Sequence, residues 1–208
     1  MPRSTAKTRE QILQAAFRQF RKKGFFRSGI DEIAEASHVT KRTLYNHFPS
    51  KDDLLAAVLV AQHERVFMTS DPYGIGPTGN AEAFIDALFR ELVVWSSKPK
   101  WAGSGFTRLA MELADLPGHP ARSIARRHKA AMENYLSGVL TAAGLEHSSE
   151  RARELMLVIE GAMLMIMVHG DRSYADTAAT AAKRLLVHIP ITSGSVAAEK
   201  SDVAHETN

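Results

Sequence analysis

Apolar residues recur along almost the whole chain at the three- and four-residue spacing of amphipathic helices, and the strict alternation expected of strands is nearly absent. The first predicted helix carries its apolar face on Ile12, Leu13, Ala16, Phe17 and Phe20. Gly24 follows at the position where a left-handed C-cap residue is favoured. The pattern predicts an all-α chain whose first helix ends at Gly24.

Two short helices are predicted next. Residues 28–31 resemble a capping box and open a second helix, which carries Ile33 and Ala34. Residues 37–39 break the pattern, and Thr40 is a suitable N-cap for a third helix over residues 41–47.

Pro49 ends the third helix, and residues 50–53 form another capping box that opens a fourth helix running to about Met68. A loop rich in glycine and proline, residues 70–79, separates this block from further helical patterns. These patterns cover residues 80–97, 101–115, 120–143, 149–170 and 173–188. We expect a first domain over residues 1–55, a second helical domain over 56–189, and a disordered tail over 190–208.

Composition and charge narrow the possible functions. The chain of 208 residues contains no cysteine, which excludes disulfides, thiolate metal sites and cysteine nucleophiles. No targeting signal is recognised, and the longest apolar run, residues 155–168, is shorter than the ~20 residues needed to span a bilayer. We therefore expect a cytoplasmic protein. Residues 1–51 carry a net charge of +7 and residues 52–208 a net charge of −4, so the N-terminal part is suited to a polyanion.

The second and third predicted helices, joined by a tight turn, form a candidate helix-turn-helix. Leu44 and Phe48 are expected to face inward and fix the third helix. In this motif the N-terminal residues of the second helix enter the major groove, where Lys41 and Arg42 can donate to guanine. Thr40 and Thr43 can meet base edges or phosphates, and the side chains expected to flank phosphates are those of Tyr45, His47 and Lys51.

Four segments resemble the DNA-binding domain of the tetracycline-repressor (TetR/AcrR) family: residues 9–17 (REQILQAAF), Gly24-Phe25, Ile33-Ala34, and residues 39–55 (VTKRTLYNHFPSKDDLL). The resemblance implies an all-helical homodimer with an N-terminal three-helix DNA-binding domain and a helical-bundle domain for ligand binding and dimerisation. It further implies a repressor that leaves a palindromic operator when a small molecule binds. The DNA contacts that it implies are Ser28, Thr40, Lys41, Arg42, Thr43, Tyr45, Asn46, His47 and Lys51.

Two positions depart from the family pattern. His38 stands in the turn where the family usually has glycine, so we expect a strained positive φ there. Gly29 replaces the usual serine or threonine beside the helix cap, which removes one possible phosphate contact.

Other features allow chemical interpretations that are weaker. Arg3, Lys7 and Arg9 are as consistent with a flexible DNA-binding arm as with ordinary solvated charge. Residues 74–79 match G-x-G-x-x-G, but no strand precedes them, so we expect a loop and no dinucleotide site. The histidines lack the spacing of a helical zinc site; a metal would require His119, His128 and His169 to converge, and we expect no metal or cofactor.

The C-terminal half is expected to form the dimer. The run over residues 155–168 is apolar on nearly every side, and the next helix carries a stripe of small residues, Ala175, Ala178, Ala179, Ala182 and Leu186. A two-fold four-helix interface would bury both, with the centre of a monomeric bundle as the alternative. Glu160 interrupts the apolar run, and either pairs with an arginine across the interface or receives a polar group of a ligand.

A ligand pocket is expected among the middle helices, and a greasy or aromatic effector would suit its residues. The candidate lining residues are Phe84, Leu88, Trp95, Trp101, Phe106, Met111, Met132, Met163 and Met167, each of which could also be plain core. No nucleophile, carboxylate pair or phosphate loop supports catalysis. An activator on the same fold is the main alternative to a repressor, and a helical-bundle ligand-binding protein or enzyme is the remaining one.

Overall fold

The computed structural model describes residues 5–76, 78 and 80–186, and within these ranges it contains helices and no strand. The all-α prediction is confirmed. The helices are α1 (Thr5–Lys23), α2 (Ile30–Ala36), α3 (Lys41–His47), α4 (Lys51–Val66), α5 (Ala81–Ser96), α6 (Gly105–Glu112), α7 (Pro120–Ala142), α8 (Ser148–His169) and α9 (Ser173–Arg184).

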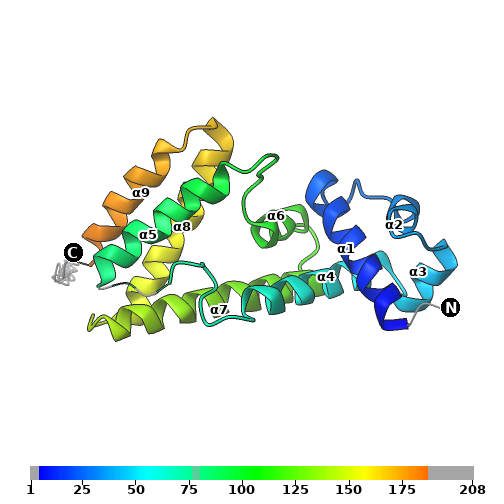
Figure 1. Cartoon of the computed structure of the whole chain (residues 1–208), viewed down its shortest axis with the longest axis horizontal. Helices are drawn as coiled ribbons and strands as arrows, with labels where there is room; N and C mark the ends of the chain where they lie inside the picture. Colours follow the sequence, from blue (N-terminus) through cyan, green and yellow to red (C-terminus); the bar gives the residue numbers. More distant parts are fainter. Residues whose placement is uncertain (1–4, 77, 79, 187–208) are drawn as a thin grey trace, which may run out of the picture.

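The helices form two groups connected by two long helices. Figure 1 shows α1, α2 and α3 at one end and α5, α8 and α9 at the other. Helices α4 and α7 run along each other between the two ends, and α6 lies between the groups. Within the described residues, no helix is both long and apolar enough to cross a membrane. The predicted tail over residues 190–208 lies outside the described residues.

Local capping sets most helix boundaries where the sequence predicts them. Gly24 adopts φ +81° and its N–H donates to the carbonyl of Phe20, which ends α1. The Thr40 hydroxyl accepts from the N–H of Thr43 at 3.1 Å and begins α3. The Ser50 hydroxyl accepts from the N–H of Asp53 at 3.0 Å and begins α4. Each cap satisfies an N–H or carbonyl group that the helix end leaves unpaired.

The predicted start of α2 is wrong in one respect. The N-cap is Gly29, whose N–H lies 3.5 Å from the Glu32 carboxylate, and Ser28 does not cap the helix. The Ser28 side chain is buried and donates to the carbonyl of Gly24 at 2.6 Å. Burial against the end of α1 directs this hydroxyl away from α2.

The helix predicted over residues 101–115 is shorter in the structure. Lys100 and Gly103 both adopt positive φ, at 60° and 69°, so the helix starts only after the Ser104 cap. The chain leaves α6 at Leu113.

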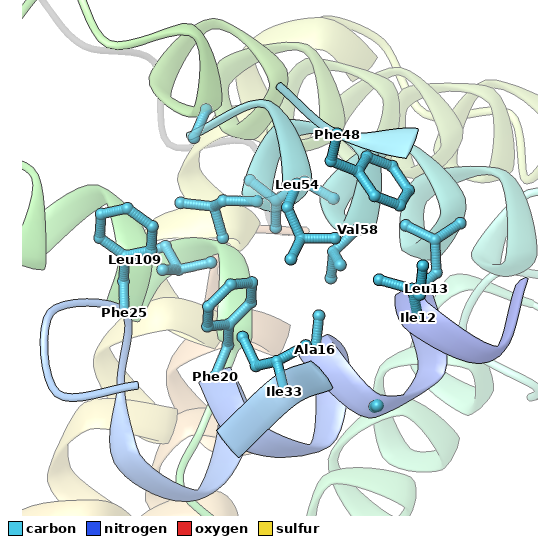
Figure 2. Close-up of a cluster of buried hydrophobic side chains, with 14 of the residues drawn as sticks. Ile12, Leu13, Ala16, Phe20, Phe25, Ile33, Phe48, Leu54, Val58 and Leu109 are labelled. Carbon is cyan, nitrogen blue, oxygen red and sulfur yellow. The ribbon is translucent and has the colours of Figure 1, made fainter. Parts of the chain in front are cut away.

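One apolar cluster surrounds the helix-turn-helix and includes side chains from the second half of the chain. Helices α1 to α4 contribute Ile12, Phe20, Ile33, Leu44 and Leu54, among others. The further members come from α6 and α7 and the residue after α6: Phe106, Leu109, Leu113, Ala121, Ile124 and Ala125. Figure 2 shows Leu109 among the labelled side chains of this cluster. Residues beyond the predicted boundary at 55 therefore complete the N-terminal core.

A second apolar cluster holds the other end together. It is formed by α5, α7, α8 and α9, with Phe84, Ile85, Leu136 and Leu140 among its most buried members. The alanine stripe of α9 packs into this cluster within the same chain.

Leu113 provides a test of the shared N-terminal core. Its side chain is fully buried, so Leu113→Ala is expected to lower the free energy of unfolding by about 2–5 kcal/mol. Leu116→Ala is the matched control, because Leu116 is exposed three residues later and its truncation leaves no cavity. Urea denaturation followed by circular dichroism measures both. Equal losses of stability in the two variants would contradict the shared core.

Candidate functional site

The turn between α2 and α3 has the backbone conformation expected from the sequence. His38 adopts φ +55°, in the left-handed region, so the predicted positive φ at this position is confirmed. The His38 N–H donates to the carbonyl of Glu35, and the Ser37 hydroxyl donates to the carbonyl of Ile33 at 2.7 Å. These bonds close the end of α2 and set the direction of α3.

Helix α3 has one buried face and one exposed face. Leu44 on the helix and Phe48 directly after it are buried in the N-terminal cluster, which confirms that they face inward. The opposite face presents Lys41, Arg42 and Tyr45, with Tyr45 40% exposed. A short helix fixed by apolar residues on one side can therefore offer a basic, polar surface on the other.

The sequence-predicted DNA contacts fall into three groups. Those with exposed side chains are Thr40, Lys41, Arg42, Tyr45 and Asn46. Thr43, His47 and Lys51 are half-buried, and Ser28 is buried. The structure brings the first two groups together on and beside α3, but it does not bring the Ser28 hydroxyl to the same surface.

Two lysines near this surface are held by local contacts. Lys41 Nζ lies 3.0 Å from the Asp31 carboxylate across the α2–α3 pair, and this interaction raises the pKa of Lys41. Lys51 Nζ donates to the carbonyl of Phe26 at 3.3 Å and lies 4.4 Å from the centre of the Phe25 ring. Burial lowers the pKa of Lys51, with partial compensation from neighbouring carboxylates. Lys51 thereby ties the start of α4 to the loop after α1, whereas the Lys41–Asp31 pair is solvent-exposed.

The proposed N-terminal arm is largely helical. Helix α1 begins at Thr5, so Lys7 and Arg9 lie in it and not in a flexible segment. The Arg9 guanidinium sits 5.1 Å from the centre of the Phe48 ring. Arg3 lies outside the described residues.

A cavity of about 530 Å³ lies between the two groups of helices and takes wall residues from α1, α4, α5, α6, α7 and α8. Of the predicted pocket residues, Leu88, Trp95, Phe106, Met132 and Met163 line it. The other four do not. Phe84 is buried in the second cluster, Trp101 packs edge-on to Trp95, and Met111 and Met167 are exposed.

The cavity also has polar walls that apolar periodicity could not reveal. Glu160 accepts hydrogen bonds from Lys129 Nζ and, at 2.7 Å, from the Thr107 hydroxyl. The partner of Glu160 is therefore a lysine of the same chain and not the expected arginine of a second subunit. The apolar run around Glu160 indicated that its carboxylate needs a polar partner. Only the fold shows that this carboxylate faces the cavity.

An aromatic and histidine cluster closes one side of the cavity. The His128 ring stacks on Phe106 with 3.7 Å between ring centres, and its Nδ1 lies 3.2 Å from Nδ1 of His63. Burial, the Lys129 ammonium and His63 lower the pKa of His128 to about 4, with burial contributing most. His128 is therefore neutral near pH 7.

The histidines and the glycine-rich segment that the sequence offered as metal or nucleotide sites have structural contacts instead. His119 caps α7, since its Nδ1 accepts from the N–H of Ala121, whereas His169 stacks on Tyr174 at the end of α8. The two do not converge with His128, and no metal-binding group of three ligands occurs among the described residues. In the G-x-G-x-x-G segment, the N–H groups of Gly74 and Gly76 donate to the Asp71 carboxylate, while Pro77 and Gly79 lie outside the described residues.

Known proteins share this arrangement. Residues 12–58 match the family described as bacterial regulatory proteins, tetR family. Over 93 residues the chain is 36% identical to the HTH-type transcriptional regulator TtgR of Pseudomonas putida, a match that covers 42% of this chain and 43% of TtgR. It is 47% identical over 51 residues to the HTH-type transcriptional activator FasR of Mycolicibacterium smegmatis, covering 24% of this chain and 23% of FasR. These matches span less than half the length of either relative.

The likeness to solved structures extends over nearly the whole chain. The crystal structure of a TetR-family transcriptional regulator from Streptomyces coelicolor matches with a TM-score of 0.74 at 25% identity, covering 87% of this chain and 95% of that one. Residues 12–58 thus carry a TetR-family helix-turn-helix domain. These matches confirm the family resemblance and the all-helical fold with an N-terminal helix-turn-helix. The TetR family is non-enzymatic, so the expectation that the chain is no enzyme is also confirmed.

The lowered pKa of His128 predicts a pH-dependent stability. In the unfolded chain a histidine has a pKa of ~6.5. Between this pH and about pH 4, the unfolded chain therefore binds a proton at His128 that the folded chain does not bind. Stability contributed by neutral His128 is complete above pH 6.5 and is lost as the pH falls toward 4. His128→Phe retains the ring stack but cannot bind the proton. Between pH 7 and pH 4 its free energy of unfolding is expected to fall by on the order of 2 kcal/mol less than that of the wild type. Urea titrations at a series of pH values measure this, and identical pH slopes in the two proteins would contradict it.

Proposed function

We propose that this TetR-family protein is a homodimeric, sequence-specific DNA-binding regulator of transcription, and that it represses by binding a palindromic operator until a small molecule binds. The observation that carries the proposal is the exposed basic and polar face of α3, fixed from behind by Leu44 and Phe48. A helix presented in this way fits the major groove of B-DNA.

We infer distinct roles for the exposed and half-buried residues on and beside α3, and for the buried Ser28. Arg42 and Lys41, at the N-terminus of α3, are placed to donate to guanine edges, and Thr40 and Thr43 to meet bases or phosphates. The side chains proposed to contact phosphates and orient the protein are Tyr45, Asn46, His47 and Lys51. For Ser28 we propose an indirect role, because its hydroxyl holds the α1–α2 loop through Gly24.

An exposed apolar face on α8 supports the proposed homodimer. Leu157, Leu164 and Val168 lie along one side of this helix and are 71%, 45% and 65% exposed. Gly161 lies on the same side, with open space where a side chain would be, so another helix can approach closely. Such a continuous apolar stripe favours burial against a second copy of α8. The alanine stripe of α9 does not take part in this argument, because it packs within the chain.

The cavity supports the proposed control by a small molecule, because it borders the helices that hold the helix-turn-helix. Helix α6 lines the cavity and also contacts the end of α1: the Glu112 carboxylate accepts from the N–H of Phe25 at 2.7 Å, and Arg108 donates to the carbonyl of Arg21 at 3.3 Å. A ligand that prefers a different position of α4 and α6 would shift the population away from the DNA-binding arrangement. Ligand and DNA would then weaken each other's binding by the same factor.

An activator is the second candidate. The relative FasR is named an HTH-type transcriptional activator, and its match to this chain extends over 51 residues. The sign of regulation depends on where the operator lies relative to the promoter.

Arg42 gives a test of DNA binding that requires no known operator. Its side chain is exposed at the start of α3, so Arg42→Ala is expected to weaken binding to a mixed-sequence duplex about tenfold and to lower the salt slope of log K by about one. Fluorescence anisotropy over a series of salt concentrations measures both quantities.

The matched control is Arg90→Ala, which removes an exposed arginine on α5, in the helix group remote from α3. This variant should bind the duplex as the wild type does. If both variants bind equally well, or if the folded wild type shows no salt-dependent binding at all, α3 is not the DNA-binding surface.

A further inference from the structure

The cavity contains an ion pair whose charges neutralise each other. Lys129 on α7 and Glu160 on α8 pair across the cavity wall, and each side chain is about one-quarter exposed, at 28% and 26%. The pair lies within a lining that is otherwise rich in aromatic side chains and methionine. In partly buried surroundings of this kind, a charge that loses its partner is destabilised.

The polar atoms of this pair are partly but not completely used. Lys129 Nζ donates to Glu160 and, at 3.3 Å, to the Ser104 hydroxyl, which leaves one of the three ammonium N–H donors. Glu160 accepts from Lys129 and Thr107, so its two carboxylate oxygens retain lone pairs. The wall can therefore give one hydrogen bond and accept another.

The other charged lining residues do not favour either sign of ligand. Arg108 and Glu112 already bind backbone groups at the end of α1. Arg21, Lys98 and Glu91 complete the charged residues of the lining, so four basic side chains face three acidic ones. The neutral state of His128 adds no further charge.

We propose that the cavity binds an uncharged, mostly apolar ring compound that carries one hydroxyl group. The hydroxyl would donate to Glu160 and accept from Lys129 without separating them. Trp95, Phe89 and Met132 would cover the apolar body. A carboxylate would compete with Glu160 for Lys129, and an ammonium would compete with Lys129 for Glu160, so either ion would leave a partly buried charge without its partner. The inference rests on the proposed function, in which this cavity is the effector site.

Three probes with one apolar body test the charge preference directly: 2-naphthalenemethanol, 2-naphthoate and 2-naphthylmethylammonium. Isothermal titration calorimetry with the full chain at pH 7 is expected to show the alcohol binding at least about tenfold more tightly than either ion. Tighter binding of either ion, or no binding of any probe up to millimolar concentration, would overturn the proposal.

Single substitutions should reverse the preference in opposite directions. Glu160→Gln leaves Lys129 as an unpaired cation, so the carboxylate probe should become the tightest of the three. Lys129→Gln leaves Glu160 as an unpaired anion, so the ammonium probe should become the tightest. The double variant carries neither charge and should keep the preference for the alcohol. An unchanged order in both folded single variants would overturn the assignment of this pair.

Glu133→Gln is the matched control. Glu133 and Arg153 form an ion pair at 3.2 Å that also joins α7 to α8, but neither residue lines the cavity. This variant should keep the wild-type order of probes, and a reversed order would show that the preference does not come from the cavity pair. Probe binding is measured without DNA, so a failure to bind refutes only the proposed ligand class. A wild-type protein that does not bind the duplex would instead refute the proposed regulatory function.

Discussion

The N-terminal domain depends on apolar side chains that come from the other half of the chain. Phe106, Leu109 and Leu113 pack with Phe20, Phe25 and Leu54 in one cluster. Helices α1 to α4 contribute most of this cluster, and burial against α6 and the start of α7 adds further apolar contacts. The orientation of α3 is therefore tied to the position of α6 and α7, and not only to the short segments that precede it in sequence.

Polar contacts make this junction directional. The Glu112 carboxylate accepts from the N–H of Phe25, directly after the glycine that ends α1, and Arg108 donates to the carbonyl of Arg21 at 3.3 Å. Apolar packing alone tolerates small sliding movements, whereas hydrogen bonds and ion pairs require particular distances and angles. A displacement of α6 by a cavity ligand would thus be transmitted to the end of α1.

The features that the sequence predicted best are those that depend on residues close together in the chain. Caps at Thr40 and Ser50, the C-terminal glycine of α1 and the inward positions of Leu44 and Phe48 follow from local chemistry and helical spacing, and the structure confirms them. The predicted cap at Ser28 is wrong for a non-local reason. Serine is a suitable cap residue, but the Ser28 hydroxyl donates to the carbonyl of Gly24 across the turn.

The cavity could be predicted only in part, because its lining is assembled from helices far apart in the chain. Leu88 and Phe106 line it, but Phe84, four residues before Leu88 on the same helix, is packed into the core. The pairing of Glu160 with Lys129 joins residues 31 positions apart on two helices, and no local pattern specifies it. The isolated glutamate signalled a buried polar interaction without identifying its partner.

We propose that two copies of this chain hold their α3 helices in register with DNA. Selection of binding sites from a random duplex pool at one fixed salt concentration tests this arrangement most directly. Wild-type protein should enrich a two-fold symmetric site whose half-sites lie about one helical turn, ~34–36 Å, apart. Leu164→Glu, which places a charge in the exposed apolar stripe of α8, should abolish the symmetry. Enrichment of an unsymmetric site by the folded wild type, or of the same palindrome by the variant, would contradict the claim.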